Sequence, residues 1–391
     1  MQGRAQTRNG VSRRQTLAAV GGATVSGLAG VPATVVGDSG REKRITTLAT
    51  GSKSQETVTV SKRWYRHKEQ AIKVKEALKR QHLGEKGVHS VGIETDDRSV
   101  GGLRGKRVRV AATPEQAGAL DAVPSSVEGI PVRAVEAERP QQTDCYTGSA
   151  DDSDGNGKSE YIGGMTFEGL EDLGTSNPST VQGGTLCCRV YKGGTKYMMT
   201  ARHPISNGAC ENTDITDGSY GWGRSSNDGV DWLGGVAQAY QKFDAALLDL
   251  RFPNYDEFTY DITAESSGGI IGRVTGDGID YLQSAAGATV RKRGRVTCET
   301  IGTIEEIRGD VSYCNGSVTE ENQIVTSLDQ KVGDSGGPVY RHLDDGSNPD
   351  DLYLLHIATR RTDTNGYAQG SSANAMNKQE GITFGGNPYD G

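Results

Sequence analysis

Apolar segments from residue 161 onward are short, and turn residues separate them. The apolar or alternating runs cover residues 187–191, 197–201, 232–240, 245–250, 289–296, 302–307, 324–328, 339–341 and 352–359. Gly, Asn, Asp and Ser lie between these runs, and no long helical periodicity interrupts the series. Regular short strands of this kind predict an all-β barrel or sandwich. The runs form two groups, about 161–255 and 265–385, which predicts two barrels with a cleft between them.

Residues 39–140 follow a different pattern and predict a small α+β unit. Within 63–81, small and apolar side chains recur at helical spacing among lysines and arginines, which predicts a helix. The other predicted elements are strands at 87–93, 107–110 and 127–135 and a short helix at 114–122. The histidines of this unit are scattered, so we expect them to be structural or solvated: His67, His82 and His89.

Charge divides the chain in the same way. Residues 1–140 hold 24 Lys and Arg against 14 Asp and Glu, whereas the remainder holds 19 against 36. A basic unit beside an acidic one predicts an intramolecular attraction between them. The basic unit could instead bind nucleic acid, but no nucleic-acid motif is present, so we expect no such partner. The acidic remainder, rich in Gly and Asp, also fits a salt-loving host.

The N-terminus predicts export. Ser12 to Leu17 contains the pair Arg13-Arg14, and a weakly apolar run broken by glycines follows it to Val36. This pattern is typical of a twin-arginine signal, here residues 1–38, and therefore of a secreted or extracellular protein. An uncleaved anchor is the alternative, but the run is too weakly apolar for a stable membrane span.

Six cysteines lie at or after residue 145, and an even number in an exported chain favours disulfides. They are Cys145, Cys187, Cys188, Cys210, Cys298 and Cys314. We expect Cys298 and Cys314 to close a local hairpin. Cys187 and Cys188 should face opposite ways on a strand, one reaching Cys210 and the other Cys145. No C-x-x-C spacing occurs, so a zinc site is not expected.

Residues 141–160 read as an acidic linker. Asp152, Asp154 and Asn156 alternate before Gly157, a pattern that can wrap oxygen ligands around calcium. The bidentate glutamate of a calcium loop is missing, because Gly163 stands at that position. We therefore expect a solvated loop and no cofactor, with structural calcium as the alternative.

The stretch Gly333-Asp334-Ser335-Gly336-Gly337-Pro338 carries the candidate chemistry. Small residues around a serine allow backbone N–H groups to converge on a developing oxyanion. A serine hydroxyl is a poor nucleophile unless a base takes its proton, so a histidine and a buried carboxylate are expected elsewhere.

Three histidines follow residue 140, and His203 is the best candidate base because it stands where an apolar strand ends. His342 lies in a charged loop, and His356 lies inside an apolar strand, where it is structural or lines a pocket. Asp244 leads an apolar strand, so burial would make it seek a partner such as a histidine Nδ1–H. Asp249, its rival, lies inside the same strand.

The order His203, Asp244, Ser335 resembles the chymotrypsin-like serine peptidases. The matching segments are Thr-Ala-Arg-His, Asp-Ala-Ala-Leu and Gly-Asp-Ser-Gly-Gly-Pro. The resemblance implies two six-stranded antiparallel β-barrels over residues 161–391 and hydrolysis of protein or peptide substrates. His203 would act as general base and then acid, Asp244 would orient it, and Ser335 would attack the carbonyl. The N–H groups of Gly333 and Ser335 would form the oxyanion hole.

The segment from Val290 to Ile304 is similar to secreted bacterial members such as the streptogrisins and α-lytic protease. That similarity implies an ion pair between Arg295 and Asp334. It also implies that residues 39–140 are a pro-region, with an accessory domain as the alternative.

Substrate preference stays open. Asp329 lies six residues before Ser335, where trypsin-like members hold the acid that selects Arg or Lys. The opposing clue is Thr359-Arg360-Arg361, after the strand of His356: if Thr359 starts the substrate-binding segment, these two arginines would favour acidic side chains.

Two other functions compete with the peptidase interpretation. A catalytically inactive, protease-like binding protein at the cell surface is the main alternative, and the intact set of three residues argues against it. An α/β-hydrolase is disfavoured because its serine precedes the acid and the histidine, whereas Ser335 comes last.

Overall fold

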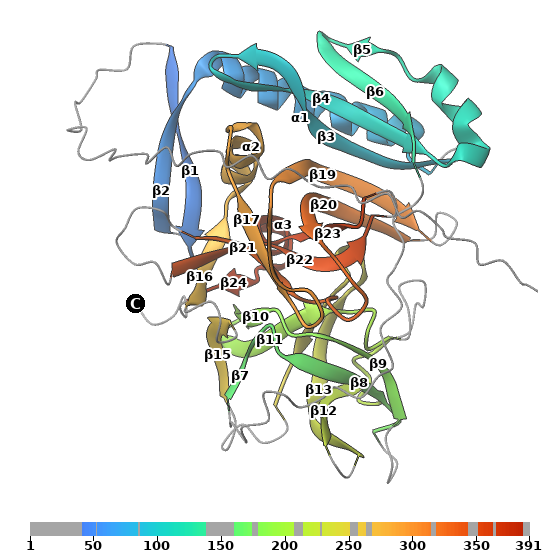
Figure 1. Ribbon diagram of the computed structural model, residues 1–391, viewed down its shortest axis with the longest axis vertical. Coiled ribbons are helices and arrows are strands. Elements are labelled where there is room, and N and C mark those ends of the chain that lie inside the picture. The colour runs from blue at the N-terminus through green and yellow to red at the C-terminus, as the bar shows by residue number, and fades with distance from the viewer. Residues whose placement is uncertain are drawn as a thin grey trace, which may run out of the picture. The chain divides into compact units, whose positions relative to one another are not determined.

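The computed structural model describes residues 41–51, 53–84, 87–137, 160–173, 179–206, 214–226, 229–250, 257–262, 268–313, 318–342, 351–362 and 365–385 (Figure 1). Three predictions lie outside these residues: the export signal, most of the linker with its calcium candidate, and the cysteines at positions 145, 210 and 314. None of the described helices is long and apolar enough to cross a membrane. The described residues also contain no cluster of His, Cys, Asp and Glu that could hold a metal ion.

The N-terminal unit is α+β, as its sequence pattern predicts. Its elements are β1 (Glu42–Thr50), β2 (Lys53–Ser61), α1 (Lys62–His82), β3 (Val88–Val100), β4 (Leu103–Ala112), the 3-10 helix η1 (Pro114–Ala122), β5 (Ser126–Val127) and β6 (Ile130–Glu136). Helix α1 begins where the Ser61 hydroxyl accepts the N–H of Trp64, an N-cap that satisfies an otherwise unpaired donor. Ala71, Val74 and Leu78 are buried on one face of α1, as their helical spacing requires.

The first barrel is built from an eight-stranded sheet in the order β24-β10-β11-β14-β13-β12-β8-β9. Its strands are β8 (Thr166–Glu171), β9 (Ser179–Thr185), β10 (Cys188–Lys192), β11 (Thr195–Ala201), β12 (Gly221–Ser226), β13 (Gly229–Tyr240), β14 (Ala245–Leu248) and β24 (Thr383–Phe384). Strand β24, from the C-terminal part of the chain, adds to the edge of β10. The sheet therefore holds more strands than the six that were expected.

The second barrel belongs to a sixteen-stranded sheet whose main path runs β18-β17-β21-β22-β23-β20-β19-β3-β4-β6-β5. Its own elements are β15 (Glu257–Ile262), β16 (Gly269–Val274), α2 (Gly276–Ser284), β17 (Val290–Gly294), β18 (Cys298–Gly302), β19 (Ile304–Tyr313), β20 (Val318–Asp329), β21 (Pro338–His342), β22 (Asp351–Arg361), β23 (Tyr367–Ser372) and α3 (Ala373–Glu380). A further short strand, β7 (Glu160–Gly163), pairs with β15. The hydrophobic pattern does not predict α2 or α3, because each helix is only about two turns long.

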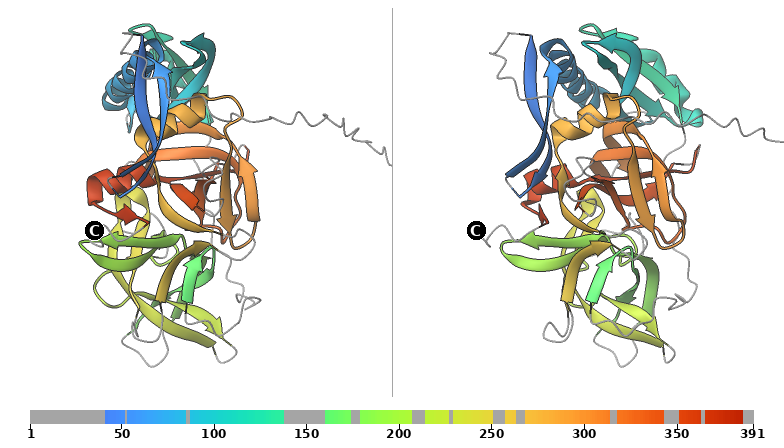
Figure 2. Two further views of the ribbon diagram at one scale, coloured as in Figure 1. Left: turned by 90° about the vertical axis from the view of Figure 1, so that its left-hand side faces the viewer. Right: turned by 60° about the vertical axis from the view of Figure 1, so that its left-hand side comes forward.

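The N-terminal unit joins this sheet at two places (Figures 1 and 2). Strand β1 pairs antiparallel with β16, and β3 pairs antiparallel with β19 so that Ile93 lies opposite Ile307. Lysines of α1 meet acids of the second barrel at the same junction. Lys75 forms a buried ion pair with Asp310, and the ammonium of Lys79 lies 3.0 Å from the same carboxylate. The sixteen strands are thus one hydrogen-bonded sheet that two different sequence patterns build.

Two apolar clusters place the barrels against each other. Met198 packs inside the first barrel, whereas its neighbour Met199 faces a second cluster that also contains Tyr340 and Leu354 of the second barrel. Adjacent strand residues point to opposite faces, so β11 contributes to both clusters at once. The residues that follow β11 therefore leave the sheet next to the barrel interface.

The predicted disulfides stay predictions, because the partners at positions 145, 210 and 314 lie outside the described residues. Cys187, Cys188 and Cys298 are free. Cys187 lies between β9 and β10 rather than in a strand, so the expected alternation does not apply, and both vicinal thiols join the same apolar cluster. Cys298 begins β18 opposite Gly294, and its predicted partner at position 314 lies outside the described residues.

Candidate active site

Strand pairing brings His203 and Asp244 together. Strands β11 and β14 pair antiparallel with Ala201 opposite Ala245, so the residues just after β11 meet the residue just before β14. Beyond this pair, the Arg202 N–H donates to the Asp244 carbonyl at 3.0 Å. Asp244 has a φ of 47°, a left-handed conformation that Asp tolerates better than most side chains. This turn directs its carboxylate at the chain that follows β11.

The Asp244 carboxylate accepts two hydrogen bonds from His203. Its Oδ1 accepts the backbone N–H at 2.9 Å, and its Oδ2 lies 2.7 Å from Nδ1. Both side chains are buried, and because an ionised carboxylate can only accept, the contact with Oδ2 assigns the proton to Nδ1 and leaves Nε2 to accept one. Burial alone would raise the pKa of Asp244, but the charge and hydrogen bonds of His203 and the charge of Arg360 outweigh it and lower that pKa.

Ser335 occupies the turn between β20 and β21, and Thr185 at the end of β9 holds that turn. The Thr185 hydroxyl donates to the Gly333 carbonyl, and the Thr185 N–H donates to the Ser335 carbonyl, each at 2.7 Å. Gly336 has a φ of 97°, and a Cβ there would stand 2.0 Å from the Thr185 carbonyl oxygen. The turn therefore requires glycine after the serine.

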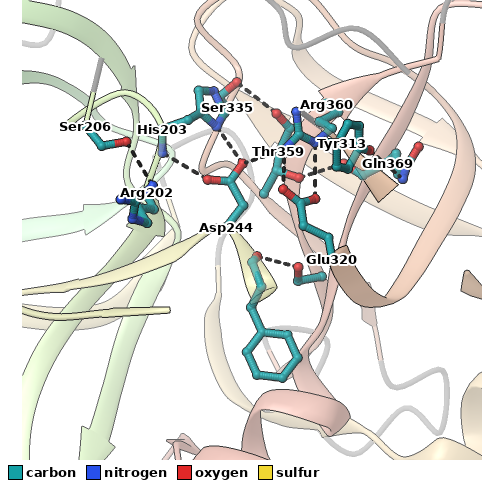
Figure 3. A network of polar contacts seen from close by, with 12 residues as sticks. Arg202, His203, Ser206, Asp244, Tyr313, Glu320, Ser335, Thr359, Arg360 and Gln369 are labelled. Atoms are coloured by element: carbon teal, nitrogen blue, oxygen red, sulfur yellow. Dashed lines mark hydrogen bonds and ion pairs between the residues drawn. The ribbon is translucent and has the colours of Figure 1, made fainter. Parts of the chain in front are cut away.

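Figure 3 shows Ser335, His203 and Asp244 next to one another where strands of the two barrels meet. The Ser335 hydroxyl donates to the Thr359 carbonyl at 3.4 Å. His203 Nε2 is buried and has no hydrogen-bond partner among the described residues. The sequence-predicted base, acid and nucleophile are thus gathered at one place, with the accepting nitrogen of the base unoccupied.

The predicted ion pair between Arg295 and Asp334 is wrong. Lys292 takes the partner's place: its Nζ lies 2.7 Å from Asp334 Oδ2, and both side chains are fully buried. The Arg295 guanidinium lies instead 3.7 Å from Glu168 of the first barrel. Buried and partly exposed side chains alternate along β17, so Lys292 faces inward together with Val290. Arg295 lies beyond the end of this strand. That alternation was the signal that could have identified Lys292.

Asp334 is further held by the strand connection that follows β17. The backbone N–H groups of Val296 and Thr297 donate to Oδ1 at 2.8 and 3.1 Å, and the Thr297 hydroxyl donates to Oδ2 at 2.7 Å. Burial opposes ionisation, but Lys292 and these donors overcome it and lower the pKa of Asp334. The residue before the serine is thus an anchored carboxylate.

The four candidates for the specificity pocket separate in the structure. Asp329 is exposed at the end of β20. His356 is fully buried, where it faces the Thr326 hydroxyl at 3.5 Å, and burial lowers its pKa to about 4. Thr359 contributes its carbonyl to Ser335. Arg360 is only 1% exposed and pairs with Glu320, so its expected part in selecting acidic side chains stays a prediction.

Arg360 points into the protein, where it pairs with a buried carboxylate. Glu320 on β20 accepts its Nε at 3.1 Å and also pairs with its Nη2. The same Nη2 lies 3.8 Å from Asp244 Oδ2. Sequence reasoning missed Glu320, although it stands two residues after Val318 on the inward face of its strand. A charged residue in such a position requires a partner.

No known family profile matches the chain, and no curated protein is significantly similar to it in sequence. Solved structures of bacterial chymotrypsin-like serine proteases are similar in fold. Protease A of Thermobifida fusca is 19% identical, with a TM-score of 0.38 over 57% of this chain and 98% of that one. A glutamic acid specific serine protease is 21% identical, with a TM-score of 0.39 over 57% of this chain and 99% of that one. A Nocardiopsis protease is 18% identical, with a TM-score of 0.38 over 57% and 98%.

Proposed function

We propose that the chain is an exported serine endopeptidase that hydrolyses peptide bonds through an acyl-enzyme formed on Ser335. The observation that carries this proposal is the double hydrogen bond from His203 to the buried Asp244 carboxylate, beside Ser335 on its own constrained turn. A carboxylate in this position fixes the imidazole tautomer and stabilises the imidazolium that forms during acyl transfer.

Each residue has a defined task in the proposed reaction. The Ser335 hydroxyl first turns from the Thr359 carbonyl toward His203 Nε2, which then accepts its proton as Oγ attacks the substrate carbonyl carbon. The N–H groups of Gly333 and Ser335 stabilise the oxyanion of the tetrahedral intermediate. His203 next gives the proton to the leaving amine, and the acyl group stays on Oγ. Water, activated by His203, then hydrolyses the ester and restores the serine.

We propose further that residues 39–140 are a pro-region and that the full chain is a latent form. The paired strands β3 and β19 and the buried pair of Lys75 and Asp310 support a folded, charge-complementary association. His203 and Ser335 are both fully buried in the full chain, which supports latency. Under this proposal the twin-arginine signal directs export, and release of the basic unit accompanies activation.

The alternative, an inactive binding protein at the cell surface, makes a different prediction for one substitution. We expect Ser335→Ala to abolish cleavage of a denatured protein and labelling by a fluorophosphonate, while circular dichroism and the melting temperature stay unchanged. Ser99→Ala, at an exposed position of β3, serves as the matched control and should retain both activities. Equal cleavage by wild type and Ser335→Ala in clean preparations would show that Ser335 is not the nucleophile.

A further inference from the structure

Arg360 reaches the candidate active site from the second barrel. Its Nη2 lies 3.8 Å from Asp244 Oδ2, the oxygen that also meets His203 Nδ1 at 2.7 Å. Figure 3 shows Arg360 and His203 approaching the Asp244 carboxylate from different sides. Strand β22 thus supplies two contacts to the site in succession, the Thr359 carbonyl to Ser335 and the Arg360 side chain to Asp244.

The guanidinium is fixed by its other neighbours. Glu320 accepts from both Nε and Nη2, a two-point contact that a planar guanidinium makes well. The ring of Tyr313 lies under it, with its centroid 3.8 Å from Cζ, and Gln369 Nε2 donates to the Tyr313 hydroxyl at 3.4 Å. Arg360 and Glu320 are each only 1% exposed. Their geometry is therefore determined by packing and not by solvent.

The buried charges explain why the site needs this cation. Asp244 and Glu320 are both buried carboxylates, and ionising two such groups close together is unfavourable without a cation between them. Among the described residues, Arg360 and His203 are the basic side chains in ion-pair distance of Asp244. Burial and the charge of Asp244 raise the pKa of Glu320, and Arg360 opposes that rise. His203 alternates between neutral and charged in the proposed reaction, whereas an arginine stays charged throughout.

We infer that Arg360, held by Glu320, is a positioning residue of the proposed peptidase: it keeps the Asp244 carboxylate ionised and aimed at His203 Nδ1. The inference rests on the proposed function for its effect on rate. The nearest hydroxyl on the same strand does not take this task, because the Thr359 hydroxyl donates to the Gln369 carbonyl at 3.5 Å.

A positioning role predicts effects that a purely structural ion pair does not. Arg360→Lys keeps the charge but loses the planar fork, so we expect kcat to fall about 10-fold while KM stays within about 2-fold. The double variant Glu320→Gln/Arg360→Gln replaces both charges by amides of similar shape. Because the neighbouring charge of Glu320 is removed together with Arg360, Asp244 stays ionised, and its charge, no longer offset by the guanidinium, favours the imidazolium. The acid limb of the pH profile of kcat/KM should therefore move upward by about half a pH unit or more. Among the described residues, Tyr313 is a further titratable group that faces this cluster.

The imidazole can also be followed without relying on activity. In the full chain carrying Ser335→Ala and 15N-labelled histidine, NMR reports the His203 titration midpoint and the Nδ1–H resonance. We expect both to change when Arg360→Lys or the double variant is added. Arg361→Gln, at the exposed next position of β22, is the matched control and should change neither.

The outcomes separate cleanly. Unchanged kcat, acid limb and Nδ1–H resonance in folded Arg360 variants that merely melt earlier would overturn the inference. If the double variant does not fold, Arg360→Lys alone decides by the same readouts. If wild type and Ser335→Ala cleave substrate alike, the proposed function fails, and the NMR titration in the Ser335→Ala chain still decides whether Arg360 positions the Asp244–His203 pair.

Discussion

Lys292 Nζ lies 2.7 Å from Asp334 Oδ2, with both side chains fully buried directly behind the turn that carries Ser335. The same ammonium donates to the Thr297 hydroxyl at 2.8 Å. The pair therefore connects strand β17 to the nucleophile's own neighbour. The conformation of the Gly333–Ser335 turn therefore depends on Lys292. The resemblance to known proteases had instead implied Arg295 as the partner of Asp334.

Replacing Lys292 should lower the stability of the folded protein. Lys292→Met leaves Asp334 buried with its hydrogen-bond donors but without a cation, so we expect a loss of about 3–5 kcal/mol in the free energy of unfolding. Urea unfolding measures that loss, and cleavage of a peptide substrate should fall with it. Arg295→Met removes a guanidinium 3.7 Å from Glu168 and should cost much less. A larger effect from Arg295→Met than from Lys292→Met would contradict the structural pairing.

Replacing Asp244 tests the orientation of the base. In Asp244→Asn an amide replaces the carboxylate, and its NH2 group would meet the Nδ1–H that Asp244 now accepts. Because the imidazole would then adopt the wrong tautomer, we expect kcat to fall about 10⁴-fold with little change in KM.

The matched control is Asp249→Asn. Asp249 is exposed after β14, and its Oδ1 accepts the Gly235 N–H at 2.6 Å, a bond that an amide oxygen can also accept. This variant should keep its activity within about 2-fold. Comparable losses from both substitutions would mean that Asp244 does not act through His203.

The sequence predicts the His203–Asp244 pair because both residues stand at ends of apolar strands that proved to be neighbours. Local patterns also predict α1 and most strands. The partners of Lys292 and Arg360 are harder to predict, because Glu320 and Asp334 lie on other strands and only the sheet order brings them close. Strand alternation identifies Lys292 and Glu320 as inward-facing charged residues but does not identify the ion-pair partner of either. Nor does any local pattern predict that β3 of the N-terminal unit pairs with β19 of the second barrel.

His356 should make the protein sensitive to acid. Burial lowers its pKa to about 4, below the ordinary value of 6.5. A group with a lowered pKa binds fewer protons in the folded state than in the unfolded state between those values. Stability is therefore complete above pH 6.5 and is lost as pH falls toward 4, by up to about 3 kcal/mol from this group.

The substitution His356→Gln tests this window. It removes the titration but keeps a side chain that can contact the Thr326 hydroxyl. We expect the slope of unfolding free energy against pH to flatten between about pH 6.5 and 4, relative to wild type. His342→Gln, on β21, removes a different imidazole and is the control for the loss of a histidine as such. A slope in His356→Gln as steep as in wild type would assign the acid sensitivity to other groups.

Processing of the chain tests the proposed pro-region. If release of the basic unit is autocatalytic, wild type should yield a discrete C-terminal fragment lacking residues before about 140, whereas Ser335→Ala should remain full length. Intact mass spectrometry and N-terminal sequencing identify the cut. The two fragments need not separate at once after cleavage, because the N-terminal unit and the second barrel share a hydrogen-bonded sheet.

Retention of the basic unit after cleavage should then depend on its ion pairs. Lys75→Glu opposes two like charges at the buried contact with Asp310, so the cleaved basic unit should dissociate more readily in size-exclusion chromatography. Arg63→Glu, at an exposed position near the start of the same helix, is the control and should leave retention unchanged. A mature wild-type protein that keeps residues 39–140 uncut would defeat the pro-region proposal, and cutting of Ser335→Ala at the same site in clean material would assign the cleavage to another protease.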